Sequence, residues 1–338
     1  MTALAVAAPL WLRTLVPGLV IVFAVAIVAR VVGRFLPATI SEVLVAVILG
    51  LVLANTVRLP SRAKPGVRFA VQRILRASII LLGARLALGE VLAIGLQAVA
   101  LIIVLMAIAL VFAYSIGRLL GLPRRLALLI GVGTAVCGNS AIIATAPVIE
   151  AEESEVSFAV ATITLFGTLA VFVYPLVGIA TQLPEVVFGL WSGTAINDTS
   201  QVVAAAAAYG SAALSAATIV KLTRNALMAP LIVGIAWWWG RGAAAARRGA
   251  AGAVPLFVVG FLAVVLLRTI GVIQPPLTGW MDEAARFGIL LALAGVGLNT
   301  SIADLRKTGL SPFLLGLGTA LLIASLSLAS IITFGLGR

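Results

Sequence analysis

Apolar segments of membrane-spanning length, interrupted by short basic loops, fill most of this 338-residue chain. Hydrophobic residues make up 62% of it and charged residues only 10%, and the mean hydropathy is +1.23. A soluble domain is about half apolar and a quarter charged, and each bilayer crossing needs about 20 apolar residues. The chain is therefore predicted to be an all-α polytopic membrane protein, with too many apolar runs for a cleaved signal peptide alone.

We expect about 11 transmembrane helices, in one transporter domain that covers residues 1–338. The predicted spans are Val16–Val32, Thr39–Ala54, Ile74–Val91, Ile94–Ile116, Leu126–Ile149, Val156–Ile179, Val186–Ala208, Ala212–Trp239, Val254–Val272, Ala284–Asn299 and Ser311–Leu336.

The loops between these spans differ in charge. Basic residues follow the second, fourth, eighth and tenth spans, whereas Glu150, Glu152 and Glu153 follow the fifth and Asp282 precedes the tenth. Basic loops stay in the cytoplasm. This predicts a bacterial inner (plasma) membrane protein with its N-terminus in the cytoplasm and its C-terminus outside. The net charge of +12 is accounted for in the same way, so no nucleic acid partner is expected.

Several kinds of chemistry lack the residues that they need. The chain has no histidine and one cysteine, Cys137, so an intrachain disulfide, a His-based proton relay and a zinc site are not expected. No phosphate-binding Walker motif is present, which leaves ATP-driven transport by this chain unsupported. No metal and no cofactor are expected apart from a coupling Na⁺ or H⁺.

Two predicted spans carry polar residues where the bilayer centre should be. In the stretch Gly131–Pro147 of the fifth span, glycines coincide with polar residues, and in the seventh span five polar side chains are consecutive. Polar groups in hydrocarbon are tolerated only where they face protein or water, and helices broken in this way form solute sites in many transporters. We take as candidates Thr134, Cys137, Gly138, Asn139 and Ser140 in the first break and Asn197, Asp198, Thr199 and Ser200 in the second. Close helix packing and a surface loop are the respective alternatives.

Charged and glycine-rich positions elsewhere add further candidates. Lys221 and Arg224 lie inside the eighth span and could face a substrate anion or Asp198, or only lock two helices together. Gly297 and Asn299 belong to a second glycine-rich break in the tenth span. Arg85 either lines the pathway or forms a salt bridge with Glu90. Asp198 is the predicted ion-coupling residue, and no catalytic residue is assigned.

Two internal similarities suggest repeats. Glu42, Gly50 and Asn55 have the spacing of Glu185, Gly193 and Asp198, and the motif GVGT at Gly131–Thr134 returns at Gly295. Both pairs are five spans apart, which predicts inverted repeats. Residues 16–34 would be a leading helix, 37–179 the first repeat and 184–336 the second.

A second similarity is closer but unexplained by these repeats. GTAVCGNSAIIATA at Gly133–Ala146 resembles GTAINDTSQVVAAA at Gly193–Ala206. Two spans separate them, so an 11-span topology makes the two segments parallel.

Several motifs resemble those of the YeiH-type conserved membrane proteins, for which sulfate export has been suggested. They are AVCGNSAIIATAPVI, INDTSQVVAAAAAYG, ATIVKLTRNALMAPLI and ALAGVGLNTSIADLRKTG. The resemblance implies a secondary transporter of the same fold group as bile-acid/sodium symporters and sodium/proton antiporters, with discontinuous crossing helices.

The expected function is secondary active transport of a small anion, with sulfate or an organic sulfonate as first guess. The alternatives are a Na⁺- or H⁺-coupled organic acid carrier, a cation/proton exchanger and, in another class, an intramembrane hydrolase that uses Ser140 or Ser200 with Lys221. Expected partners are the anionic solute and the lipid bilayer, and the sequence leaves a homodimer open.

Overall fold

A computed structural model describes residues 10–35, 42–57, 60–240, 256–300 and 310–337, and every regular element in these ranges is helical. The helices are α1 (Leu10–Gly33), α2 (Glu42–Thr56), η1 (Ser61–Ala63), α3 (Lys64–Phe69), η2 (Ala70–Ile74), α4 (Leu75–Leu82), η3 (Gly83–Arg85), α5 (Leu88–Leu119), α6 (Arg124–Ala135), α7 (Asn139–Thr145), α8 (Glu153–Ala180), α9 (Glu185–Ala195), α10 (Thr199–Tyr209), α11 (Ser211–Ala226), α12 (Met228–Trp238), α14 (Leu256–Thr269), α15 (Leu277–Leu298) and α17 (Leu310–Thr333).

Within the described residues, five helical segments are long and apolar enough to cross a bilayer, or six if one bent pair counts as a span. The five are Thr14–Gly33, Ala98–Leu119, Glu153–Ala180, Ser211–Trp238 and Leu310–Thr333. The predicted count of 11 therefore stays a prediction. The loop residues Arg247, Arg248, Arg306 and Lys307 lie outside the described ranges.

The predicted third and fourth spans have different bounds in the structure. The chain bends by 107° between Ser61–Arg85 and Leu88–Leu96, so the break falls at Leu86 and Ala87 and not between Val91 and Ile94. The sequence predicts that the basic residues from Arg62 to Arg76 form a loop after the second span. This is wrong, because they lie in the helical segment Ser61–Arg85. The π-helix turn η2 interrupts this segment between α3 and α4, and the 3-10 helix η3 ends it.

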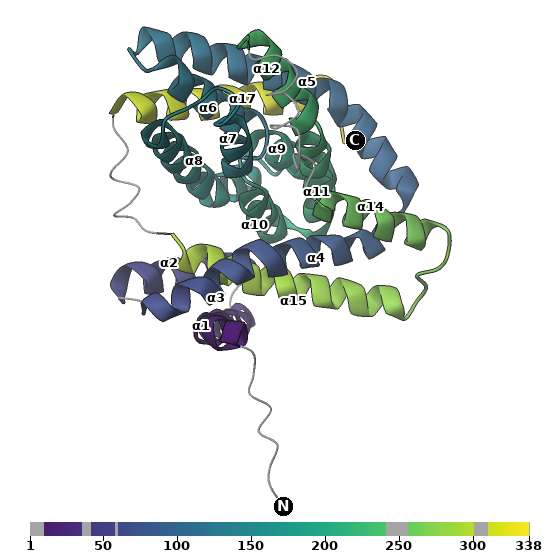
Figure 1. Cartoon of the computed structure of the whole chain (residues 1–338). Coiled ribbons are helices and arrows are strands. Elements are labelled where there is room, and N and C mark those ends of the chain that lie inside the picture. The colour runs from purple at the N-terminus through teal and green to yellow at the C-terminus, as the bar shows by residue number, and fades with distance from the viewer. Residues whose placement is uncertain (1–9, 36–41, 58–59, 241–255, 301–309, 338) are drawn as a thin grey trace, which may run out of the picture.

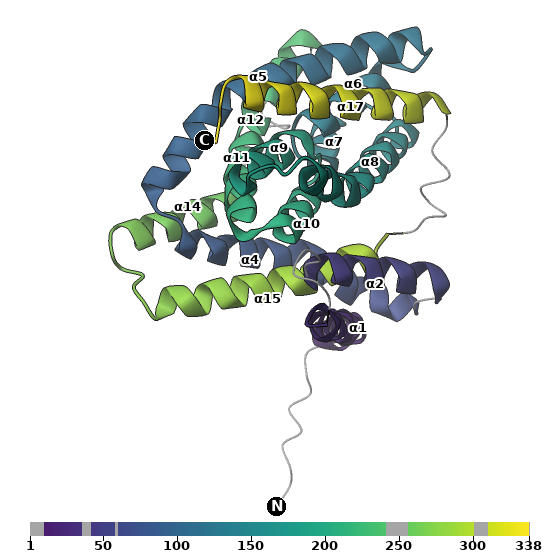
Figure 2. The same ribbon diagram turned by 180° about the vertical axis from the view of Figure 1, so that it is seen from behind.

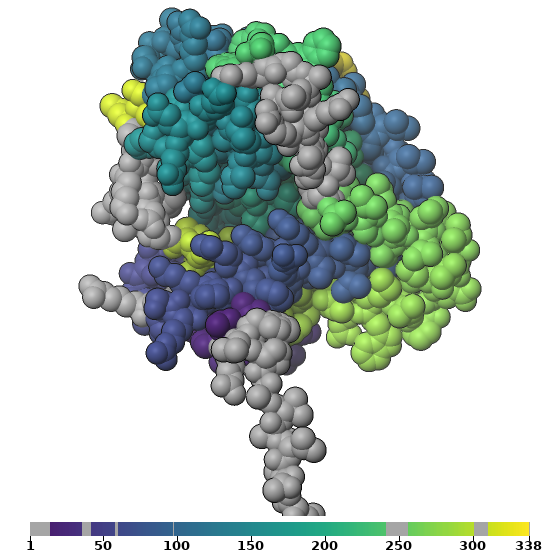
Figure 3. All heavy atoms as spheres, in the orientation of Figure 1, coloured from purple at the N-terminus to yellow at the C-terminus, as the bar shows by residue number. Residues whose placement is uncertain are grey.

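The helices form two groups (Figure 1). We call α1, α2, the segment Ser61–Arg85 and α15 the side layer. We call α5 to α12 with α17 the tip bundle, because it contains the breaks between α6 and α7 and between α9 and α10. Helix α14 packs on both α4 and α5, and α10 is the helix of the tip bundle that packs on α2 and α15. The same division is seen from behind (Figure 2) and in the space-filling view (Figure 3).

Helices α9 and α10 form a hairpin. Straight continuation would separate Glu185 from Gly210 by about 37 Å, yet a Cβ added to Gly210 would lie 2.3 Å from Glu185 Cδ. Glu185 Oε2 also accepts a hydrogen bond from the backbone nitrogen of Ala212 at 2.7 Å. The predicted span Val186–Ala208 is therefore two helices that fold back on each other: α9 enters the bundle and α10 returns to the level where α9 began.

Helices α6 and α7 also turn sharply at their break. Gly133 and Ile142 would lie about 13 Å apart in a straight helix, but a Cβ added to Gly133 would lie 2.9 Å from Ile142 Cδ1. Gly138 supplies the turn with φ of 67° and ψ of −126°, a conformation that residues with a Cβ rarely adopt. The predicted interruption of the fifth span is thus present, between Val136 and Gly138.

Helices α2 and α15 pack closely in the side layer. A Cβ added to Gly50 would lie 2.6 Å from the carbonyl oxygen of Ala294 and 3.0 Å from Gly297 Cα. Asn55 Nδ2 donates to the carbonyl oxygen of Thr300 at 3.0 Å. Small residues permit this backbone approach inside a membrane, so Gly297 has a packing role here.

Candidate functional site

The two breaks meet at Lys221 on α11. The side chain of Lys221 is fully buried, with 0% exposure. Its Nζ donates to the carbonyl oxygen of Val136 at 2.8 Å, to that of Ile196 at 3.0 Å, and to that of Asn197. One ammonium group therefore joins the break after α6 to the break after α9. We call residues 134–139 and 194–201, which contain these breaks, the two tips.

Arg224, one helical turn further along α11, makes the same connection. Its Nε donates to the Ala135 carbonyl oxygen at 2.7 Å and its Nη2 to that of Thr134, both at the end of α6. Its Nη1 donates to the carbonyl oxygens of Thr194 at 2.9 Å and Ile196 at 3.0 Å, at the end of α9.

These contacts have a clear physical cause. The last carbonyl groups of a helix have no intrahelical partner, and together they form the negative end of the helix dipole. In a buried region without water, each unpaired carbonyl would be costly. Lys221 and Arg224 together donate to six such oxygens, so the carbonyl groups at both helix ends have donors. The carbonyl oxygens in turn replace the water molecules that the two cations lost on burial.

Asp198 lies at the start of α10 and against the other tip. Its Oδ1 accepts hydrogen bonds from Ser200 N at 2.8 Å and Ser200 Oγ at 2.6 Å, and Gln201 completes a capping box. A Cβ added to Gly138 would lie 3.4 Å from Asp198 Cβ. The carboxylate therefore caps α10 while it remains half-buried, beside the turn between α6 and α7.

Thr164 on α8 connects the tips from a third side. Its Oγ1 accepts a hydrogen bond from Asn139 Nδ2 at 3.2 Å, and its carbonyl oxygen accepts one from Gln201 Nε2 at 3.5 Å. Gly167, one turn further, leaves the space that the Gln201 side chain fills. Thr164 could not be singled out from the sequence, since a lone threonine in an apolar helix is common.

Asn225 completes the cluster. It is 1% exposed, and its Nδ2 donates to Thr199 Oγ1 at 3.2 Å. It lies four residues after Lys221 and therefore on the same face of α11, and in the sequence it belongs to the same polar stretch as Lys221 and Arg224. The amide oxygens of Asn139, Asn197 and Asn225 are buried without a hydrogen-bond partner.

The structure brings together most of the predicted site. Thr134, Asn139, Asn197, Asp198, Thr199, Ser200, Lys221 and Arg224 all lie at the tips. Among the described residues, no salt bridge joins Lys221 or Arg224 to Asp198 within 4.0 Å. The observed partners favour the alternative that these cations lock helices together.

The remaining candidates make no hydrogen bond to Lys221, Arg224 or Asp198 that the structure describes. Ser140 is exposed, and Cys137 Sγ lies 3.4 Å from Met228 Sδ. Asn299, also exposed, ends α15 in the side layer together with Gly297. Arg85 contacts Asp282, at 4.0 Å, and not Glu90.

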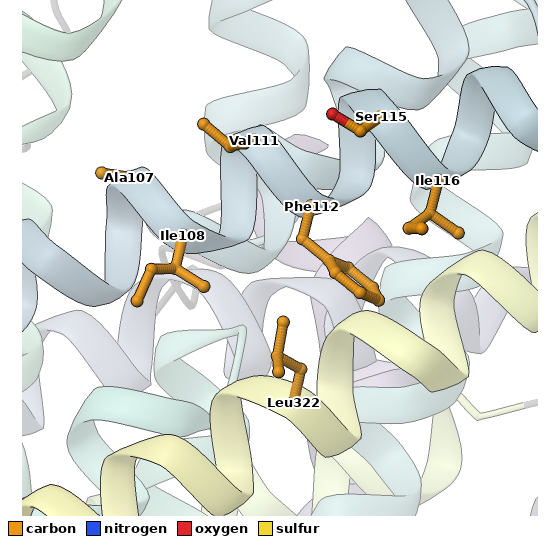
Figure 4. Close-up of a pocket in the computed structure, with 7 residues that line it drawn as sticks. All are labelled: Ala107, Ile108, Val111, Phe112, Ser115, Ile116 and Leu322. Carbon is orange, nitrogen blue, oxygen red and sulfur yellow. The ribbon is translucent and has the colours of Figure 1, made fainter.

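A surface groove between α5 and α17 is apolar. Ala107, Ile108, Val111, Phe112, Ser115, Ile116 and Leu322 line it, and Figure 4 shows Phe112 and Leu322 pointing toward each other from the two helices. Its one polar side chain, Ser115, offers no charge to a solute, so we do not assign this groove to the functional site. Among the described residues, no group of three or more His, Cys, Asp or Glu side chains is placed to hold a metal ion.

Fold and site together define a helical membrane protein whose centre is two helix breaks bridged by buried cations. The chain belongs to the UPF0324 (YeiH) family of membrane proteins: the family model described as conserved hypothetical protein 698 matches residues 17–316. The resemblance stated from the motifs is thereby confirmed.

Curated relatives carry the same family name. A UPF0324 membrane protein of Corynebacterium glutamicum is 32% identical over 330 residues, which cover 96% of this chain and 94% of the relative. One from Streptococcus agalactiae is 33% identical (94% and 97%), and one from Fusobacterium nucleatum is 31% identical (88% and 92%). No solved structure matches the chain significantly.

Proposed function

We propose that this protein is a secondary active transporter that moves a small anion across the bacterial inner membrane, with sulfate or an organic sulfonate as first guess. The observation that carries the proposal is a buried excess of positive charge at the tips. Lys221 and Arg224 are 0% and 2% exposed, and Asp198 directly follows Asn197, whose carbonyl oxygen accepts from Lys221. Buried charge of one sign is strongly unfavourable unless it is compensated, and a bound anion compensates it.

The carbonyl partners of the two cations do not remove this excess. Each helix end supplies a partial charge equivalent to about −0.5, which stabilises the cations. Because peptide groups have no net charge, the net positive charge of the two side chains remains. An anion bound at the tips would reach the electrostatic field of both cations without having to displace their backbone hydrogen bonds.

The proposed topology has nine crossings and two re-entrant segments. The crossings are α1, α2, Ser61–Arg85, α5, α8, α11 with α12, α14, α15 and α17. The pairs α6–α7 and α9–α10 enter from opposite sides, with the single crossing α8 between them. The basic loops then still share one side, and the N-terminus in the cytoplasm and the C-terminus outside are unchanged.

This topology also accounts for the closer sequence similarity. Gly133–Ala146 and Gly193–Ala206 contain the two tips, and one crossing between them makes them antiparallel. Inverted re-entrant segments that meet near the midplane are a known way to build a transport site. The proposed fold remains within the group of transporters with inverted repeats and discontinuous helices.

Alternating access in this proposal moves the tip bundle against the side layer. Lys221 and Arg224 bind both tips, so the tips move as one unit. The contact of α10 with α2 and α15 is then the sliding surface.

A flux assay tests the proposal. Purified protein in liposomes should take up labelled sulfate or another small anion faster than protein-free liposomes do, with saturation and competition among anions. Absence of flux for every small anion tried, from protein shown to be folded by cooperative thermal unfolding, would reject it.

A second candidate is a Na⁺- or H⁺-coupled organic acid carrier or a cation/proton exchanger. The three unpaired amide oxygens favour it, because oxygen atoms without donors suit a cation. It predicts flux that depends on Na⁺ or pH and is indifferent to sulfate.

We propose no enzymatic activity. In a Ser-Lys hydrolase Lys221 would activate Ser140 or Ser200, but Lys221 donates to three carbonyl oxygens and Ser200 to Asp198. Labelling of either serine by a fluorophosphonate would revive that alternative. The proposed partners are the anionic solute and the lipid bilayer, with a homodimer as an option, and the proposal involves no nucleic acid and no cofactor beyond the coupling ion.

A further inference from the structure

Three asparagine side chains at the tips each leave an oxygen atom unused. Asn197 and Asn225 are 3% and 1% exposed, and the amide oxygens of both, like that of Asn139, are buried without a donor. A buried polar atom that has lost water and gained no partner destabilises a protein by about 1–3 kcal/mol. Each such atom needs a partner such as an ordered water or an ion, and here three atoms of one chemical type lie in one region.

The three asparagines are all neighbours of Asp198. Asn197 directly precedes Asp198 in the sequence, and Asn225 is hydrogen-bonded to Thr199, the residue after Asp198. Asn139 follows Gly138, which packs against Asp198. The three asparagines therefore lie in the region around Asp198 where both tips meet α11. Asp198 and Asn139 are half-buried there.

The chemistry of these groups selects the ligand. Carboxylate and amide oxygens are the ligands of hard cations, and an anion would find acceptors where it needs donors. A proton would need the carboxylate alone and would leave the three amide oxygens unexplained. A divalent cation usually binds several carboxylates, whereas here one carboxylate lies near two buried cations, Lys221 and Arg224.

We propose that Asp198 and the amide oxygens of Asn139, Asn197 and Asn225 bind a single monovalent hard cation, Na⁺. This inference rests on the proposed transport function, in which Na⁺ is the coupling ion. Ser200 holds the Asp198 Oδ1 atom through its N and Oγ, which orients the carboxylate. The cation adds the positive charge that a bound anion balances, so the two ligands favour each other at the same tips.

Thermal unfolding of the purified full-length protein in detergent tests cation binding without transport. Four salts at equal ionic strength separate the ions: sodium chloride, potassium chloride, choline chloride and choline sulfate. Sodium chloride should raise the unfolding temperature by about 5 °C over choline chloride at concentrations far above the dissociation constant. Equal unfolding temperatures in sodium and choline chloride would overturn the proposal, as would a rise produced by choline sulfate alone.

Variants locate the site. Asn225→Ala should weaken Na⁺ binding by at least about tenfold, whereas Asn225→Asp keeps an oxygen and should retain the response. The matched control is Asn55→Ala, in the side layer, which should respond to Na⁺ like the wild type. If Asn225→Ala does not fold, Thr199→Val removes the partner of Asn225 and serves the same test. An undiminished Na⁺ response in Asn225→Ala, or in Thr199→Val where that variant is used, would place the cation elsewhere.

The flux assay separates this inference from the proposed function. Anion flux that is the same in Na⁺ and choline rejects the cation site and leaves the transporter proposal intact. A Na⁺-dependent rise in unfolding temperature without any anion flux rejects the transporter proposal and leaves the cation site.

Discussion

Glu185 accepts a hydrogen bond from the backbone nitrogen of Ala212 at 2.7 Å, so α9 and α11 begin side by side. The same carboxylate accepts a longer bond from Ala213 N at 3.4 Å. Tyr209, at the end of α10, stacks on Phe188 of α9 with ring centroids 3.9 Å apart. These contacts close the mouth of the α9–α10 hairpin and give it its direction.

The hairpin predicts which loops share a side of the membrane. In a background where Cys137 is replaced by Ala, single variants Thr181→Cys and Ser211→Cys should react with a membrane-impermeant thiol reagent from the same side. Glu153→Cys should react from the opposite side, because α8 lies between. All three positions are exposed.

An 11-crossing topology gives a different pattern. There, positions 181 and 211 lie on opposite sides and position 153 shares the side of 211. That labelling pattern in intact and permeabilised cells would rule out the re-entrant arrangement.

Lys221→Met should destabilise the protein strongly. The variant leaves carbonyl groups of Val136, Ile196 and Asn197 buried without their donor. Removal of one partner from a buried charged interaction costs about 3–5 kcal/mol. Thermal unfolding in detergent measures the loss, and Arg124→Met, an exposed position at the start of α6, should change it little. Equal stability of the two variants would contradict the bridging role of Lys221.

Gly138→Ala should disturb the tip because of its backbone conformation. A Cβ at φ of 67° and ψ of −126° is strained, and it would also meet Asp198 Cβ at 3.4 Å. Backbone strain of this kind costs about 1–3 kcal/mol. Gly279→Ala, where a Cβ meets open space, is the matched control. We expect lower unfolding temperature and lower flux for the first variant only, and unchanged values for both would argue against a strained tip.

Asp198→Asn should separate stability from coupling. An asparagine can still accept the hydrogen bond from Ser200 N, and it caps helices about as well as aspartate. The unfolding temperature should therefore stay close to that of the wild type, while dependence of flux on Na⁺ or pH disappears with the charge. Asp282→Asn, at the Arg85 contact, is the control. Unchanged ion dependence in Asp198→Asn would reject the coupling role of Asp198.

Much of the candidate site could be predicted from residue type alone. Polar residues such as Asn139 and Asp198 in apolar segments mark a break, because hydrocarbon does not tolerate unpaired polar groups. The location of each candidate in the fold was harder to predict. Gly297, like Gly138, is a glycine next to polar residues in an apolar segment, but it packs on Gly50 in the side layer. A glycine that allows close helix contact and one that allows a turn look alike in a sequence.

The sequence by itself determined the membrane class, the two interruptions and the family, because each depends on composition or on local motifs. Only the tertiary structure decided that α9 and α10 fold back on each other, since a hairpin and a straight helix can have similar length and hydropathy. It also decided that Lys221 and Arg224 bind carbonyl groups. Those partners are backbone atoms, which every residue has, so no pattern of side chains could reveal them.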